Sequence, residues 1–338
     1  MKKGLIFALI LCFALLTVMS VSAKGQGDAA QGQKKVVIVN VPKLVGGAWF
    51  NLVKTGHERY AKENPHVDFF QQGHTSADVA MQIREIENVI EQKVDIITVI
   101  PNSPESLEPV LAKARAAGIV VIAHEAQGIV NADYDVEAFD NAEYGAHLMD
   151  RLAEKTGATG EYVLMVGMLT ATSHNQWMRG ALARQKEKYP NMKIISETFF
   201  ESGNNQRLAQ DRTTEILKAY PNLKGIIAGA ATDVPGIALA VEEAKQIGKV
   251  FVVANGVPNV NRVYIQSGAI AHLSCWDPAD VGYIVSKVGE IVKNGGKVTA
   301  GMNLGLKGYE KVRVEGNVII GSAWKNFIIG STPDAEWF

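Results

Sequence analysis

The sequence predicts an α/β fold of two doubly wound lobes, each a parallel sheet covered by helices. Three observations predict it. Apolar runs of strand length alternate with helical segments at even spacing, and this alternation restarts after Asp140 and Asn141. The chain of 338 residues also exceeds the size at which one hydrophobic core usually divides. Strands in such a pattern run parallel and are joined by right-handed crossovers.

Residues 35–70 form the first βαβ unit of the predicted sheet. The run at 36–41 is apolar on both faces, which is typical of a strand buried in a parallel sheet. A helix is predicted at 48–64 and a second strand at 67–70. Ligands of such units lie beyond the carboxyl ends of the strands. We therefore expect the loop after the first strand to bind a ligand through Lys43, Trp49 and Phe50.

The remaining elements continue the alternation. In the first series we predict helices at 78–92 and 106–117 and strands at 96–100 and 119–123. In the second series we predict helices at 144–156, 176–189, 205–219 and 234–247 and strands at 162–166, 193–199, 225–228 and 250–254. A segment at 271–276, a helix at 279–293 and a Gly-rich, strand-prone tail at 295–329 do not fit a simple second lobe. We interpret them as chain that passes back across the junction between the lobes.

The amino-terminal region is typical of a cleaved export signal. Lys2 and Lys3 precede an apolar run at 5–18, and small residues end at Ala23. The run is shorter than the roughly 20 residues of a membrane-spanning helix, and a polar tail follows at 24–33. Cys12 lies inside the apolar run and not behind a cleavage site, which argues against a lipid anchor. We expect a signal peptide at 1–23, a flexible tail at 24–33 and a soluble protein in the periplasm.

Composition and motifs exclude several classes of function. A net charge of -1 gives no basic footprint for nucleic acid, and Cys275 would be the one cysteine of the mature chain. The sequence has no G-x-S-x-G motif, no phosphate loop and no G-x-G-x-x-G fingerprint. The seven histidines form no H-x-x-x-H pair, and there is no CxxC. We therefore predict no catalysis, no cofactor and no metal; a zinc cluster assembled from distant histidines is the alternative.

Polar and aromatic side chains follow the predicted strands. Amides and carboxylates can form paired hydrogen bonds with vicinal hydroxyls, and Trp faces can bury the C–H surface of a ring, so the set suits a polyhydroxylated ligand. The candidate ligand-binding residues are Lys43, Trp49, Phe50, His124, Glu125, His174, Asn175, Trp177, Thr232, Asp233, Asn255, Trp276 and Asp277. For each of them the alternative is a solvated strand end or a core aromatic, and for Thr232, Asp233 and Asp277 a helix cap.

A family resemblance rests on the segments VPKLVGGAWF, SPESLEPVLAKARAAGI, HNQWMRG and EILKAYPNLKGIIA and on the pair Trp276-Asp277. In these the chain resembles type I periplasmic sugar-binding proteins of ABC transporters, and it is most similar to the rhamnose-binding and autoinducer-2-binding branch. The resemblance covers essentially the whole mature chain. It implies two Rossmann-like lobes joined by three crossovers, with an N-terminal lobe at 34–140 plus 277–294 and a C-terminal lobe at 141–276 plus 295–338.

The resemblance also implies roles for single residues. Lys43 matches the binding-loop lysine of the branch, and Trp49 and Phe50 match the aromatics that cover the ligand. His124-Glu125 stands where the branch has Trp-Asp, and Ser173-His174 stands where autoinducer-2 binders have Asp-Gln. Residues 229–231, Gly-Ala-Ala, replace a Pro-Asp-Ala segment. These departures remove an acidic side chain and argue against autoinducer-2 itself, though not against a sugar or polyol.

The function that the resemblance implies is that of an exported receptor. We expect a monomer that captures a small sugar or polyol between its lobes and delivers it to the permease subunits of an ABC importer, with no nucleic-acid partner. Two alternatives stay open. One is a periplasmic sensor of an autoinducer-2-like or nucleoside ligand, and the other is an exported hydrolase or isomerase that uses Glu125 and His174 as acid and base.

Overall fold

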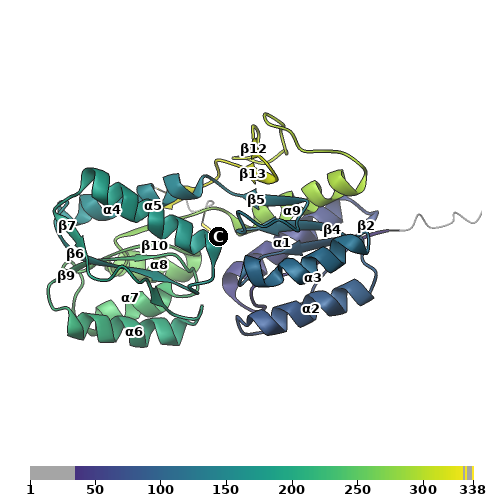
Figure 1. Cartoon of the computed structure of the whole chain (residues 1–338). Coiled ribbons are helices and arrows are strands. Elements are labelled where there is room, and N and C mark those ends of the chain that lie inside the picture. Colours follow the sequence, from purple (N-terminus) through teal and green to yellow (C-terminus); the bar gives the residue numbers. More distant parts are fainter. Residues whose placement is uncertain (1–34, 330–331, 333–336) are drawn as a thin grey trace, which may run out of the picture. The chain divides into compact units, whose positions relative to one another are not determined.

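The computed structural model describes residues 35–329, 332 and 337–338, and the chain from Val36 onward forms one compact unit (Figure 1). Within the described residues, two seven-stranded sheets build this unit, with helices packed on their faces. The predicted fold class, two parallel-sheet lobes of α/β type, is confirmed. The predicted export signal lies outside the described residues. No helix in the described part of the chain is long and apolar enough to cross a membrane.

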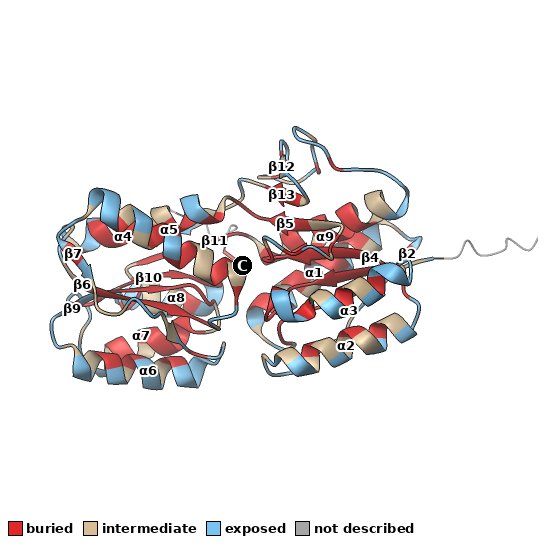
Figure 2. Ribbon diagram, viewed as in Figure 1, coloured by how far each residue is buried: buried red, intermediate tan, exposed pale blue. Residues whose placement is uncertain are grey.

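The first sheet has the strand order β12-β13-β5-β4-β3-β1-β2. The first five strands of the chain run parallel to one another in this sheet. They are β1 (Val36–Val41), β2 (Val67–Gln71), β3 (Ile96–Val99), β4 (Val120–His124) and β5 (Tyr134–Glu137). Helices α1 (Ala48–Glu63), α2 (Val79–Glu91), α3 (Pro104–Ala116) and α9 (Pro278–Lys293) pack on it. Strand β3 is buried along its whole length. Helices cover both faces of this sheet, whose strands are largely buried (Figure 2). We call this sheet and these helices the N-terminal lobe.

The second sheet has the order β14-β11-β10-β9-β6-β7, and β8 pairs with β6. Its strands are β6 (Gly160–Val166), β7 (Met192–Ile194), β8 (Phe200–Glu201), β9 (Leu223–Ala228), β10 (Phe251–Asn255), β11 (His272–Cys275) and β14 (Lys325–Phe327). Its helices are α4 (Asn141–Thr156), α5 (Thr172–Lys188), α6 (Gln206–Ala219), α7 (Val234–Glu243) and α8 (Pro258–Ser267). We call this sheet and these helices the C-terminal lobe.

The carboxyl-terminal tail divides between the two sheets. Strands β12 (Arg313–Glu315) and β13 (Val318–Ile320) join the first sheet, where β13 pairs in parallel with β5. Strand β14 joins the second sheet, antiparallel to β11. Our placement of residues 295–338 in the C-terminal lobe is therefore wrong for 313–320. The reason is physical: three-residue strands without a helix of their own carry no periodicity that indicates which sheet they join.

Four further features differ from the prediction. Strand β5 was missed because its acidic residues, Asp135 and Glu137, interrupt the apolar pattern, and helix α8 was missed after Pro258. The strand predicted at 193–199 is two short strands, β7 and β8. Helix α5 begins at Thr172, four residues earlier than predicted, so that residues 173–175 lie in its first turn and not in a loop.

Close packing of several helix pairs depends on glycines, as Gly56 and Gly145 illustrate. A Cβ added at Gly56 in α1 would lie 1.8 Å from the carbonyl oxygen of Ala279 in α9. A Cβ added at Gly145 in α4 would lie 2.0 Å from the carbonyl oxygen of Trp177 in α5. A side chain at either position would push the two helices apart.

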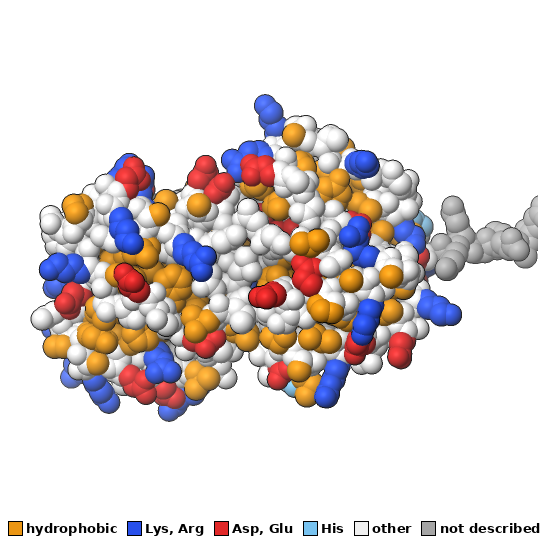
Figure 3. Space-filling model, viewed as in Figure 1, with side chains coloured by type: hydrophobic (Ala, Val, Ile, Leu, Met, Phe, Trp, Pro, Cys, Tyr) orange, Lys and Arg blue, Asp and Glu red, His pale blue; other side chains and the backbone are white. Residues whose placement is uncertain are grey.

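The surface is mixed in charge on the face shown in Figure 3, where Lys or Arg and Asp or Glu side chains are interspersed.

Candidate functional site

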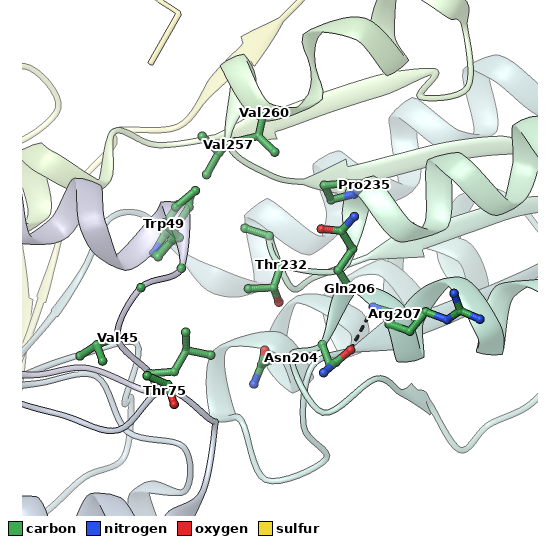
Figure 4. A pocket seen from close by; sticks show the side chains of 16 residues that line it. Val45, Trp49, Thr75, Asn204, Gln206, Arg207, Thr232, Pro235, Val257 and Val260 are labelled. Carbon is green, nitrogen blue, oxygen red and sulfur yellow. Dashed lines mark hydrogen bonds between the residues drawn. The ribbon is translucent and has the colours of Figure 1, made fainter.

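Both lobes contribute to a small cavity near the carboxyl ends of β1, β4, β9 and β10. Its volume is about 20 Å³, and it is lined by Lys43, Trp49, Phe50, Glu125, His174, Asn204, Ala230, Ala231, Thr232 and Asn255. Seven of these ten residues were predicted as site residues. A larger pocket of about 580 Å³ shares Trp49, Asn204, Ala231 and Thr232 with it. In Figure 4, Val45 and Trp49 lie on one side of that pocket, and Asn204, Thr232 and Pro235 lie on the other.

A buried ion pair forms the N-terminal-lobe wall of the cavity. Lys43 Nζ lies 2.5 Å from Glu125 Oε2, and both side chains are about 95 % buried, at 4 % and 6 % exposure. Lys43 follows β1, and Glu125 follows β4 with φ 58°, a left-handed conformation that is uncommon outside glycine. Such a backbone at a strand end is kept only where its surroundings hold it, which is typical of functional sites.

The charges around Glu125 keep its carboxyl ionised. Burial by itself would raise the pKa of Glu125, but the positive charge of Lys43 and the neighbouring imidazoles outweigh it and lower that pKa to about 2. Burial and, to a lesser extent, the positive charge of Lys43 lower the pKa of the His174 imidazole to about 3, so His174 is neutral near pH 7. An acid/base couple needs pKa values near the working pH. With pKa values this far below neutral pH, Glu125 and His174 favour a binding role over the acid and base roles of the enzyme alternative.

Two hydrogen bonds cross between the lobes beside the cavity. The Ser173 hydroxyl donates to Glu125 Oε2 at 3.1 Å, and the Thr170 hydroxyl donates to the carbonyl oxygen of Asn102 at 3.0 Å. Ser173 lies in the first turn of α5, and the early start of that helix brings its hydroxyl to the carboxylate. The carboxylate of Glu125 thus contacts both lobes.

Asn255 and Asn204 form much of the C-terminal-lobe wall. Asn255 ends β10; it accepts a hydrogen bond from the Tyr144 hydroxyl at 3.2 Å and donates to the carbonyl oxygen of Gly229 at 3.1 Å. Asn204 lies in the loop after β8 with φ 53°, and its Nδ2 is buried without a hydrogen-bond partner among the described residues. Asn204 was not predicted as a site residue, because the two-residue strand β8 gives no strand signal before it.

Aromatic side chains pack behind the cavity. The ring centroid of Trp276 lies 4.7 Å from Trp49, 5.6 Å from Trp177 and 5.9 Å from His124, with edge-to-face geometry. Trp177 Nε1 donates to Asn141 Oδ1 at 2.6 Å, whereas Trp276 Nε1 is buried without a partner in the described part of the chain. His124 Nδ1 donates to the carbonyl oxygen of Val136 at 2.6 Å. These three side chains support the wall and do not line the cavity.

Three other predicted residues lie away from the cavity. Asn175 Nδ2 donates to the carbonyl oxygens of Leu169 and Ala171 and holds the loop before α5. Asp277 accepts a hydrogen bond from the Ala279 amide at 2.9 Å and caps α9. This is the helix-cap role given as its alternative in the sequence prediction. Asp233 is fully buried and accepts hydrogen bonds from the hydroxyls of Ser202 and Thr232. Thr232 itself lines the cavity.

Metal ligation at this site has no support from its side chains. Within residues 35–329 and the described carboxyl-terminal positions, no group of three or more His, Cys, Asp or Glu side chains is arranged to hold a metal ion. The polar groups at the cavity are one ammonium, one carboxylate, amides, a hydroxyl and a neutral imidazole. These groups suit hydrogen bonds to a hydroxylated molecule.

Comparison with known proteins gives a match over most of the chain. Residues 38–297 match the family described as "Periplasmic binding protein domain". The chain is 26 % identical over 245 residues to a "Xylitol-binding protein" of Mycolicibacterium smegmatis, covering 71 % of this chain and 67 % of that protein. It is 28 % identical over 265 residues to a "D-ribose/D-allose-binding protein" of Pseudomonas aeruginosa, covering 75 % of this chain and 80 % of that protein.

Solved structures share the fold. A solute-binding protein of an ABC transporter from Clostridium phytofermentas with bound L-rhamnose has a TM-score of 0.81 at 23 % identity, covering 88 % of this chain and 97 % of that one. LsrB from Clostridium saccharobutylicum in complex with AI-2 has a TM-score of 0.80 at 19 % identity, covering 87 % and 97 %. At these identities the likeness concerns the fold.

Proposed function

Because this chain belongs to the periplasmic binding protein family, we propose that it is an exported receptor that binds a small sugar or polyol between its lobes and delivers it to an ABC importer. Its curated relatives include proteins named for xylitol and for D-ribose and D-allose. The observation that carries the proposal is the cavity that Lys43 and Glu125 line from one lobe and Asn204 and Asn255 line from the other.

The charge balance of the site favours a neutral ligand. The ammonium of Lys43 is compensated by the carboxylate of Glu125, and the imidazole of His174 is neutral. An anionic ligand would compete with Glu125 for Lys43 and leave a buried carboxylate unpaired, which is costly. A polyol can accept from Lys43, donate to Glu125 and bond to the two asparagines with no net charge, while Trp49 and Phe50 cover its C–H surface.

The size of the cavity supports a binding mode with opening and closing of the lobes. A space of about 20 Å³ holds about one water-sized probe, far less than a sugar. Ligand entry therefore requires the lobes to separate and to close again over the ligand, with the hydrogen bonds of Ser173 and Thr170 re-forming or being replaced. A ligand that touches both lobes favours the closed form by its differential affinity for the two forms.

Location and partners belong to the same proposal. We place the mature protein in the periplasm as a monomer that begins at Lys24, with permease subunits of the inner membrane as its partners. Mass spectrometry of the exported protein tests the cleavage site. Protein that retains Met1 and stays with the membrane would contradict soluble export.

A thermal-shift panel on residues 24–338 tests the ligand class. Xylitol, D-ribose, D-allose, L-rhamnose and D-arabinose are compared with uridine and adenosine. A ligand at 100 times its dissociation constant adds about 2.7 kcal/mol to the free energy of unfolding. Glu125→Gln should lose the shift, and the exposed Glu87→Gln should keep it. A shift with nucleosides alone would favour the sensor alternative, and conversion of the ligand would favour an enzyme.

A further inference from the structure

Two histidines outside the cavity bring their Nε2 atoms to the same pair of oxygens. His147 lies in α4 and His272 in β11, and their ring centroids are 5.6 Å apart. Between them, Ser274 of β11 and Asn326 of β14 face each other as partners across the antiparallel strand pair. His147 Nε2 lies 2.9 Å from Asn326 Oδ1 and 3.2 Å from Ser274 Oγ. His272 Nε2 lies 2.9 Å from Ser274 Oγ and 3.2 Å from Asn326 Oδ1.

The distances from each imidazole nitrogen to the two oxygens, and between the two oxygens, match those of neighbouring ligands around one metal ion. With metal–nitrogen bonds of about 2.0–2.1 Å, ligands at right angles lie about 3 Å apart and tetrahedral ligands about 3.4 Å apart. The spacings here are 2.8 Å between Ser274 Oγ and Asn326 Oδ1 and 2.9–3.2 Å from each Nε2. The same spacings suit hydrogen bonds, so the chemistry of the donors must decide.

The donor set is two imidazole nitrogens and two neutral oxygens. Imidazole is a preferred ligand of Cu²⁺, Zn²⁺ and Ni²⁺, and a hydroxyl and an amide oxygen can complete a site of mixed nitrogen and oxygen ligands. His272 and Ser274 are buried, whereas Asn326 is exposed, so an ion can reach the group from solvent on the β14 side. Each ring would carry its proton on Nδ1 and offer the Nε2 lone pair.

The choice among divalent ions follows from the donor types. In the usual order of first-row divalent metals, a given site of nitrogen and oxygen ligands binds Cu²⁺ most strongly, so Cu²⁺ is the ion that this donor set should favour.

We propose that His147 and His272, with Asn326 and Ser274, form a binding site for a divalent transition-metal ion, with Cu²⁺ preferred over Zn²⁺. The site lies at the edge of the second sheet and is separate from the ligand cavity. Its ligands come from α4, β11 and β14. Strand β14 is the first strand of the second sheet after the chain leaves β13 of the first sheet. If this proposal is correct, the sequence prediction that the protein binds no metal is wrong at this edge of the second sheet.

Trp324 gives the site its own optical readout. Its ring is stacked on His147, with centroids 5.6 Å apart and an angle of 21° between the planes. Bound Cu²⁺ quenches indole fluorescence at short range.

The mature protein, freed of metal with a chelator, is titrated with Cu²⁺ and in parallel with Zn²⁺ as a competitor. The variants are His147→Gln, His272→Gln and Trp324→Phe. The control is His74→Gln, an exposed histidine whose imidazole bonds to nearby Ser76. Glutamine keeps a polar group at the ε position, and thermal melting in chelator verifies that each variant is folded.

The expected result is saturable quenching with one ion per chain. Either site variant should weaken it about 10-fold or more, the control should leave it unchanged, and Zn²⁺ should reverse it only when present in large excess over Cu²⁺. Trp324→Phe should lose most of the quenching while calorimetry still measures Cu²⁺ binding. Quenching that does not saturate, or that folded His147→Gln and His272→Gln retain in full, would show that the two imidazoles serve only as hydrogen-bond partners. Binding that His74→Gln abolishes would place the ion elsewhere. Sugar binding is measured on the same samples and should persist in chelator, so failure of this proposal and failure of the receptor proposal are distinguishable.

Discussion

Glu125 Oε2 accepts from two lobes at once: Lys43 Nζ lies 2.5 Å away, and Ser173 Oγ lies 3.1 Å away. One carboxylate oxygen therefore joins the loop after β1 to the first turn of α5. This arrangement makes Glu125 both a stabilising group and the residue through which we expect ligand binding and lobe closure to be coupled.

The first prediction concerns the stability of this ion pair. Lys43→Met leaves the buried carboxylate without its ammonium, and the loss should be about 3–5 kcal/mol in the free energy of unfolding. Glu125→Gln should cost a similar amount, because it leaves the ammonium unpaired. The double variant Lys43→Met/Glu125→Gln should be more stable than either single variant, since no buried charge remains. Urea denaturation measures all four proteins. Additive losses would mean that the two charges do not interact as the geometry indicates.

The second prediction follows from the pKa of Glu125. Its folded-state pKa is lowered from 4.5 to about 2, so its contribution to stability is present above pH 4.5 and is lost as the pH falls from about 4.5 to about 2. The stability difference between the wild type and Glu125→Gln should therefore shrink over that range. Denaturation at pH 6, 4 and 3 measures it. A difference that is constant across these values would contradict a lowered pKa.

The third prediction concerns Asp233, whose pKa is shifted in the opposite direction to that of Glu125. Burial raises its pKa to about 7, although Ser202 and Thr232 donate to it. A carboxyl with a raised folded-state pKa favours folding below its unfolded pKa and loses that contribution as the pH rises from about 4 to about 7. Asp233→Asn cannot ionise, so it should gain stability relative to the wild type over this range. Melting curves at pH 4, 5.5 and 7.5 are the measurement, with Asp68→Asn, at an exposed position, as control. An unchanged difference between variant and wild type would show that Asp233 is ionised throughout.

The resemblance to periplasmic sugar-binding proteins, drawn from the sequence, is confirmed at the level of family and fold. Lys43 and Glu125 could be predicted because each follows a strongly apolar strand, and parallel strands bring their carboxyl ends to one edge. Asn204 could not be predicted as a site residue, because the strand before it has only two residues and leaves no apolar run in the sequence. Asp277 illustrates the converse: it follows a predicted strand, yet its carboxylate is used by the helix that it begins. Proximity to a strand end predicts the edge at which a residue lies, whereas its hydrogen-bond partners are set by packing between lobes.

The fourth prediction concerns the contact of α4 and α5. Gly145→Ala would place a methyl group 2.0 Å from the Trp177 carbonyl oxygen, so the helices must separate. Overpacking of this kind costs about 1–3 kcal/mol. Because Ser173 lies on α5, the same shift should weaken its bond to Glu125 and reduce ligand affinity. Ala146→Gly, on the same helix, is a control for helix propensity. A Gly145→Ala protein as stable as the wild type would mean that the two helices are not held at this distance.

The last prediction tests whether both walls of the cavity hold one ligand. Asn255→Ala removes an amide that lines the cavity from β10, and Asn204→Ala removes one from the loop after β8. Each loss leaves ligand hydroxyls unpaired in a closed site, which costs about 1–3 kcal/mol of binding free energy. Glu125→Ala should cost a comparable amount from the other lobe.

Asn175→Ala is the matched control for these variants, since Asn175 bonds to the backbone of its own loop and does not line the cavity. Small-angle scattering, with the best ligand of the thermal-shift panel, should show compaction of the wild type and the control at the same concentration. The three cavity variants should need roughly 5- to 150-fold more ligand, as 1–3 kcal/mol requires. If Asn204→Ala and Asn255→Ala compacted like the wild type while Glu125→Ala did not, the ligand would bind to the N-terminal lobe alone. Closure would then depend on Ser173 and Thr170 and not on contacts between the ligand and the second wall.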